Sequence, residues 1–190
     1  MTVNLSPSVN ILRDAERPSN YIPTANSRHI YTQIASQFKS GVRSFSIVGS
    51  YGTGKSAFLL ALMNHFNGTN PNNFGSINGQ FNGLKKFEFI SIVGANRSFL
   101  DAFAEELDCE PNQKEVFKVL KKKREALKKQ NLCCIIIADE FGKFLEYATN
   151  NDPSVQLYFL QELAEFVNDP DKNFLFFRYL KQKLNIFCFK

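Results

Sequence analysis

A segment of the chain combines glycines with a lysine and a serine directly after the apolar residues 45–48. It matches the pattern G-x-x-x-x-G-K-[ST] and consists of Gly49, Ser50, Tyr51, Gly52, Thr53, Gly54, Lys55 and Ser56. Glycines let the backbone curl so that successive N–H groups point inward at a dense anion. This phosphate-binding (P-loop) pattern predicts a nucleotide triphosphate as ligand. We expect Lys55 to act on the β- and γ-phosphates as a catalytic residue, and the whole loop with Ala57 to contact the nucleotide.

An acidic pair, Asp139 and Glu140, follows the continuous apolar run of residues 132–138. The carboxyl ends of parallel strands are where α/β sheets bind ligands, and adjacent carboxylates are costly there unless a cation compensates them. Mg²⁺ prefers oxygen ligands, so we expect Asp139 and the hydroxyl of Ser56 to hold it. Glu140 is expected to activate the attacking water as general base.

A GTPase is the alternative nucleotide-binding class. Residues 139–142 also satisfy D-x-x-G, a pattern of GTPases. A GTPase is expected to carry [NT]-K-x-D after a later strand, and the chain contains no such tetrapeptide. The glutamate directly after Asp139, and an additional strand expected over residues 87–93, favour an ATPase with a catalytic glutamate.

Apolar runs typical of strands alternate with amphipathic helical patterns along the chain. The expected strands are residues 45–48, 87–93, 132–138 and 174–177, and the expected helices are residues 27–39, 57–66, 98–107, 112–130, 141–147 and 155–166. Residues 67–83, rich in Asn and Gly, are expected to form a loop. The alternation predicts an α/β fold, a three-layer sandwich with a mostly parallel sheet. We expect an irregular lead-in over residues 1–20 and one domain over residues 21–190.

Composition excludes several classes of protein. The 190 residues include 44% hydrophobic residues and four cysteines, and carry a net charge of +5. The cysteines form no C-x-x-C pair, which argues against a zinc site and a disulfide framework, so a reducing, cytoplasmic location is expected. The adjacent Cys133 and Cys134 are expected to be buried thiols on opposite faces of a strand. No apolar run approaches the roughly 20 residues of a membrane-spanning helix, and no membrane contact is expected.

The helix expected over residues 112–130 is rich in lysine. Six of its basic residues form two clusters, Lys121, Lys122, Lys123 and Arg124, and Lys128 and Lys129. They permit contact with a nucleic-acid backbone. However, Val116, Leu120 and Leu127 share one face of the same helix, which favours a solvated face for the lysines.

The two motifs resemble those of the AAA+-like P-loop ATPases, a group that includes origin-recognition initiators, STAND signalling ATPases and antiviral-defence ATPases. The resemblance covers roughly residues 20–177. It implies binding of ATP and Mg²⁺, and hydrolysis of ATP that powers or switches a larger assembly. It also makes Tyr21, Ile22 and Pro23 candidates for contact with adenine, although an apolar lead-in that packs on the core explains them equally well.

The chain departs from this group towards its C-terminus. A polar sensor residue is expected after the fourth strand, where Arg178 and Tyr179 stand. The group's strand order 5-1-4-3-2 also requires a fifth strand and then a helical lid, and residues 178–184 are too few for a crossover, which takes at least about 10–12 residues. We therefore expect a domain truncated at its C-terminus, with the P-loop strand at an edge and with oligomer or protein partners through the missing lid. A nucleotide-gated interaction module with little turnover, or a fragment without function, are the alternatives.

Overall fold

A single sheet of four parallel strands and one short antiparallel strand lies at the centre of the chain, in the order β2-β3-β4-β1-β5. The strands are β1 (Ser44–Gly49), β2 (Lys86–Val93), β3 (Leu132–Asp139), β4 (Phe174–Lys181) and β5 (Ile186–Cys188). The computed structural model describes residues 9–15, 21–49, 52–69, 74–75, 77, 79–81, 83–84, 86–169, 173–181 and 186–188.

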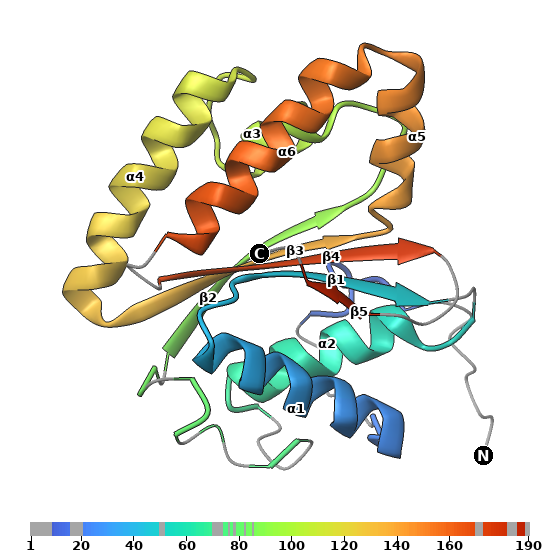
Figure 1. Cartoon of the computed structure of the whole chain (residues 1–190), viewed down its shortest axis with the longest axis vertical. Helices are drawn as coiled ribbons and strands as arrows, with labels where there is room; N and C mark the ends of the chain where they lie inside the picture. Colours follow the sequence, from blue (N-terminus) through green and yellow to red (C-terminus); the bar gives the residue numbers. More distant parts are fainter. Residues whose placement is uncertain are drawn as a thin grey trace.

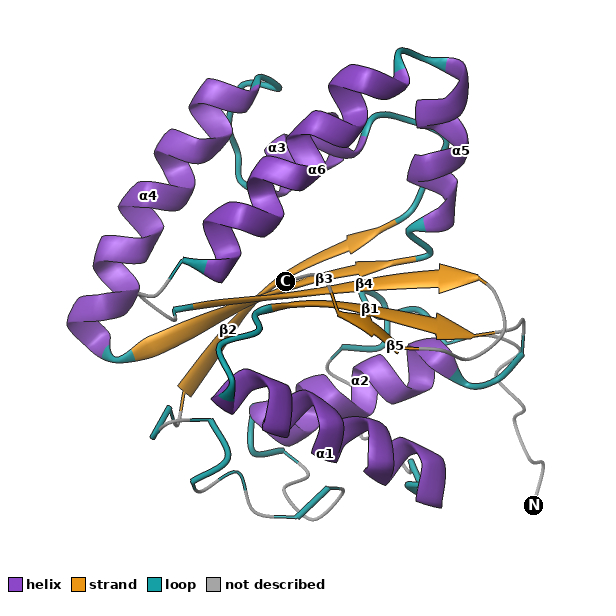
Figure 2. Cartoon of the chain, in the orientation of Figure 1, coloured by secondary structure: helices purple, strands orange, loops and turns teal. Residues whose placement is uncertain are grey.

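Helices cover both faces of the sheet (Figure 1). One layer holds α1 (Ala25–Lys39) and α2 (Lys55–Phe66), and the other holds α3 (Phe99–Glu106), α4 (Gln113–Gln130), α5 (Gly142–Asn150) and α6 (Pro153–Asn168). Figure 2 shows the strands as the middle layer between the two groups of helices. The three-layer α/β sandwich expected from the sequence is confirmed.

The continuous apolarity of β3 is explained by two separate cores, one on each face of the sheet. Its side chains alternate between a core beside α1 and α2, with Cys133, Ile135 and Ile137, and a core beside α3 to α6, with Cys134, Ile136 and Ala138. All six are fully buried. The prediction of two buried thiols on opposite faces is therefore confirmed, and burial raises the pKa of Cys134 to about 12.

The strand order agrees with the expected 5-1-4-3-2, but the fifth strand differs from the expectation. β5 is present and runs antiparallel to β1, where it pairs with Phe45, Ser46 and Ile47. The prediction that the P-loop strand forms an edge is thus wrong over these residues. The physical reason is that an antiparallel neighbour needs no helical crossover, so the few residues after β4 suffice to reach it.

The other expected elements are present, and their boundaries differ from the expected ones by at most four residues. β4 does not end at Phe177 but continues to Lys181. α2 begins at Lys55, so the motif lysine is the first residue of the helix. The described residues between 67 and 84 form turns and bends rather than helix or strand, and two of them, Phe74 and Phe81, are buried in the core beside α1.

The start of the chain contributes to the same core. Ile11 is fully buried, and the backbone N–H of Asn10 donates a hydrogen bond of 3.0 Å to the Asp14 carboxylate. None of the helices in the described ranges is long and apolar enough to cross a lipid bilayer. The boundary at residue 20 stays a prediction.

Candidate functional site

The P-loop motif joins the carboxyl end of β1 to the first turn of α2. Ser50 and Tyr51 lie outside the described residues. Gly52 and Gly54 have φ angles of +75° and +76°, in the left-handed region that favours glycine. Gly54 is the N-cap of α2, and no side chain caps the helix. The N–H groups of a first helical turn point towards its N-terminal end, where the helix dipole favours negative charge.

Gly49 leaves room for the loop to fold back over the end of β1. A Cβ atom at this position would lie 3.2 Å from both Cδ of Lys55 and Oγ1 of Thr53. The side chain of Lys55 thus passes directly over Gly49. Its Nζ lies 5.7 Å from the ring centre of Tyr179, on β4. The lysine side chain therefore lies near the carboxyl ends of β1 and β4.

Ser56 and Asp139 meet although they are far apart in the sequence. The Ser56 hydroxyl lies close enough to the Asp139 carboxylate to lower the pKa of that group. β1 and β3 both pair with β4, so their carboxyl ends are one strand apart, about 10 Å, and the first turn of α2 spans that gap. The sheet order therefore brings the two expected magnesium ligands together.

The environment of Asp139 suits a cation. The residue is 4% exposed. Burial raises the pKa of its carboxyl, and the Glu140 charge adds to this, whereas the hydrogen bonds from Ser56 and from the Glu140 amide and the charge of Lys55 lower it. Within the described ranges, no three or more His, Cys, Asp or Glu residues are arranged so that they could hold a metal ion by themselves. One carboxylate and one hydroxyl fit Mg²⁺, which usually keeps water and phosphate oxygens as further ligands.

Glu140 lies at the mouth of the site with its side chain half exposed. Its φ angle is +49°, and its backbone N–H donates a hydrogen bond of 2.8 Å to Oδ1 of Asp139. The carboxylate forms an ion pair with Lys143, one turn along α5. The sequence analysis missed Lys143, and the i,i+3 spacing from Glu140 is the signal that points to it.

Tyr179 is the other residue that the sequence analysis missed. It is 5% exposed on β4, and its carbonyl oxygen accepts a hydrogen bond of 2.9 Å from the Phe141 N–H. Burial raises the pKa of its hydroxyl, and the charges of Asp139 and Tyr21 add to this effect. The sequence predicts a strand that ends at Phe177, and therefore a polar sensor directly after that residue. Because β4 continues, Tyr179 lies inside the strand, beside Lys55 and Asp139.

Tyr21, one of the three residues expected near adenine, packs on the core beside α1 and α2. Its ring centre lies 6.2 Å from that of Phe74. The charge of Tyr21 is also one of the causes that raise the pKa of Tyr179. Ile22 is 84% exposed. Thr24 then caps α1 by accepting a hydrogen bond of 3.1 Å from the Ser27 N–H. Contact of Tyr21, Ile22 or Pro23 with adenine stays a prediction.

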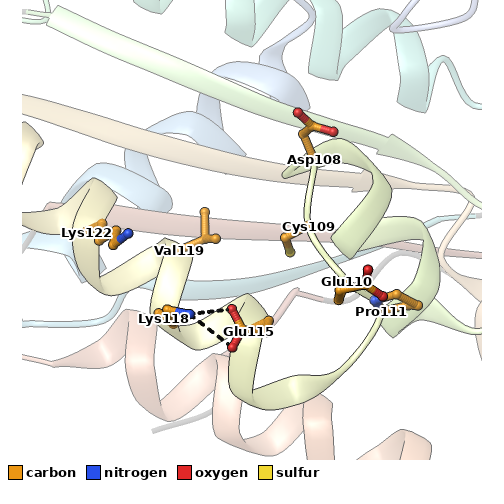
Figure 3. Close-up of a pocket in the computed structure, with 8 residues that line it drawn as sticks. All are labelled: Asp108, Cys109, Glu110, Pro111, Glu115, Lys118, Val119 and Lys122. Atoms are coloured by element: carbon orange, nitrogen blue, oxygen red, sulfur yellow. Dashed lines mark hydrogen bonds and ion pairs between the residues drawn. The ribbon is translucent and has the colours of Figure 1, made fainter.

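An open hollow of about 610 Å³ lies elsewhere, between the end of α3 and the first half of α4 (Figure 3). It is lined by Asp108, Cys109, Glu110, Pro111, Glu115, Lys118, Val119 and Lys122. No strand residue lines it, and Lys118 and Glu115 pair with each other at 2.8 Å. It shares no residue with the P-loop site.

Three solved structures share the fold. Aeropyrum pernix ORC2 in ADPNP–ADP complexes aligns with a TM-score of 0.52 and 18% identity, over 87% of this chain and 44% of that chain. C. elegans PCH-2 aligns with a TM-score of 0.52 and 16% identity, over 89% of this chain and 41% of that chain. Drosophila ORC bound to DNA aligns with a TM-score of 0.54 and 12% identity, over 96% of this chain and 47% of that chain.

This chain shares its fold with these three structures. At these identities the similarity shows the fold alone, and the chain spans less than half the length of each of the three. No protein-family model matches the chain. No curated protein matches it either.

Proposed function

We propose that the chain is an ATP- and Mg²⁺-binding domain that hydrolyses ATP and thereby powers or switches a larger assembly. The observation that carries the proposal is the close approach of the Ser56 hydroxyl to the Asp139 carboxylate. It joins the uncapped start of α2 to the buried carboxylate at the end of β3, so phosphate-binding and cation-binding groups converge at one edge of the sheet.

Each residue has a role in the proposed reaction. The loop amides and Lys55 hold the triphosphate, and Ser56 and Asp139 hold Mg²⁺, which neutralises the charge that develops on the phosphates. Glu140 takes the proton from the attacking water. The structures of ORC2 with ADPNP and ADP share the fold, which supports a nucleotide as ligand. ATP is preferred to GTP in this proposal because the chain lacks [NT]-K-x-D.

Calorimetric titration with ATP and GTP in the presence of Mg²⁺ tests the proposal. Lys55→Ala removes a charge-assisted phosphate contact, worth roughly 1.5–3 kcal/mol, so ATP affinity should fall at least about tenfold. Lys39→Ala removes an exposed lysine of α1 and serves as the matched control. Equal ATP affinity in the folded Lys55→Ala variant and in the control would contradict the proposal.

A nucleotide-gated module with little turnover is the second candidate function. The ion pair between Glu140 and Lys143 favours it, because a carboxylate engaged by a lysine must leave that lysine before it can take a proton from water. An exposed pair is worth at most about 1 kcal/mol, so Lys143→Ala should speed hydrolysis by no more than about fivefold. Glu140→Gln should bind ATP but lower any hydrolysis by about 10²-fold or more. Tight ATP binding with no ADP formed by either the parent chain or Lys143→Ala would favour the module.

A further inference from the structure

The backbone of Glu140 adopts a conformation that its side chain does not favour. Within the described ranges, four residues other than glycine have positive φ angles: Asp108, Asn131, Glu140 and Asp152. Asp and Asn tolerate the left-handed region because their short side chains bond locally, whereas glutamate has no such advantage. Glu140 is held there by the bond from its N–H to the Asp139 carboxylate. Such strain persists only where the surroundings enforce it.

Gly94 is the neighbour that leaves space for this conformation. It is buried directly after β2, and its N–H donates a hydrogen bond of 2.8 Å to the carbonyl oxygen of Asp139. A Cβ atom at this position would lie 2.7 Å from the carbonyl carbon of Glu140 and closer still to its oxygen. Both atoms belong to the backbone, so no side-chain rotation can relieve the clash.

Position 94 requires glycine because a Cβ atom there would not fit against the Glu140 backbone. Gly94 is absent from the glycines with positive φ, so alanine could adopt its backbone conformation. Any side chain would force the peptide of Glu140 to retreat by roughly 1 Å to reach ordinary contact. Gly142 lies on the other side of Glu140 at the start of α5, and a Cβ there would meet nothing within 4 Å. The chain therefore offers a matched pair of glycines close to the same carboxylate.

We propose that Gly94 is a positioning residue for Glu140: by admitting the Glu140 peptide against the end of β2, it sets where the carboxylate lies relative to the attacking water. The inference rests on the proposed ATPase function. The three atoms nearest to a Cβ at Gly94 belong to the backbone of residues 139 and 140, and its N–H bonds the Asp139 carbonyl oxygen, so we expect its role to lie in hydrolysis rather than in ATP affinity. A misplacement of about 1 Å at a reacting group can cost about 10²-fold in rate.

The test compares Gly94→Ala with Gly142→Ala in the full chain. We expect Gly94→Ala to lower kcat by about 10²-fold while the Kd for MgATP changes less than about threefold. Affinity for ADP with aluminium fluoride, which mimics the phosphoryl transition state, should fall about tenfold or more, the scale of one lost charged hydrogen bond. Gly142→Ala should match the parent chain in all three. In a Glu140→Gln background, Gly94→Ala should have little further effect on kcat, because the two changes act through one carboxylate.

A second-site variant covers the outcome in which Gly94→Ala folds poorly. Glycine at position 140 is free to leave the left-handed region, so Glu140→Gly should restore much of the thermal stability lost by Gly94→Ala. Equal loss of stability in the presence and absence of Glu140→Gly would overturn the inference. So would equal kcat and equal ADP–aluminium fluoride affinity in Gly94→Ala and the parent chain. A parent chain that binds no ATP would instead contradict the proposed function.

Discussion

Asp139 combines two demands that oppose each other in the absence of a metal. In the proposed function it must be ionised to hold Mg²⁺, yet burial raises the pKa of its carboxyl and the charge of Glu140 raises it further, against the opposing effects of Ser56 and Lys55. The folded state therefore binds the proton more tightly than the unfolded chain does. Deprotonation at neutral pH lowers the stability of the metal-free protein as a result.

Replacement of this carboxylate should stabilise the metal-free chain and remove its response to Mg²⁺. For Asp139→Asn at pH 7 with a chelator, we expect a higher Tm, by about 2–4 °C for each kcal/mol recovered. The parent chain should gain stability when MgATP is added, and the variant should gain much less. Thermal unfolding measures both effects, with Glu125→Gln, an exposed carboxylate on α4, as control. A lower Tm for Asp139→Asn in the chelator would show that its charge is stabilising.

At the level of secondary structure, the apolar pattern of the sequence was enough to predict β3 and the position of the two motifs directly after strands. β3 is unbroken because its side chains enter both cores, so the acidic pair had to follow it at the sheet edge. The same reasoning did not predict the full length of β4. Arg178 reads as the end of an apolar run, yet it lies inside the strand in register with Ala138, and its guanidinium lies 5.3 Å from the ring centre of Phe176.

Tertiary contacts decide the features that the sequence did not predict. Tyr179 belongs to the site because β4 lies between β1 and β3, which becomes clear only once the strand is known to continue. The role of Gly94 depends on how closely the end of β2 approaches Glu140. A lone glycine between a strand and a loop carries no such signal in the sequence. The antiparallel direction of β5 likewise follows from pairing rather than from composition.

The lysines of helix α4 are expected to lie on its solvent-exposed face. Its apolar side chains Val116, Leu120 and Leu127 are buried, and several of its basic residues already pair within the chain: Lys118 with Glu115, Lys123 with Glu88, and Arg124 with Asp169. This arrangement explains the lysines without a nucleic-acid partner.

Fluorescence anisotropy with duplex DNA, repeated over a range of salt concentrations, tests this interpretation. The double variant Lys121→Gln, Lys129→Gln on α4 should bind DNA as the control Lys39→Gln, Lys86→Gln does, and with the same salt dependence. Each lost phosphate contact would change the slope of log K against log salt by about 0.9. A slope lower by about 2 in the α4 variant alone would show that these lysines contact DNA.

At the scale of the whole molecule, the carboxyl ends of the parallel strands bring together segments that are far apart in the sequence. β1 carries the P-loop at its carboxyl end, with β4 on one side and β5 on the other. Pairing with β5 covers Phe45, Ser46 and Ile47, only two residues before the loop begins at Gly49. The backbone that supports the proposed nucleotide site is thus held on one side by the shortest strand of the sheet.

Loss of β5 should therefore affect both association and nucleotide binding. Replacement of residues 186–188 by Gly-Ser-Gly keeps the chain length but removes strand-forming side chains, which would expose the unpaired N–H and C=O groups of β1 as an edge. We expect the variant to have a lower Tm than the parent chain and to self-associate as concentration rises from about 1 to 100 µM, as followed by sedimentation velocity. MgATP should reduce the association, because ligand binding favours the ordered β1 and P-loop. A variant that stays monomeric at every concentration, with the Tm and ATP affinity of the parent chain, would show that β4 alone is enough to hold β1 in place.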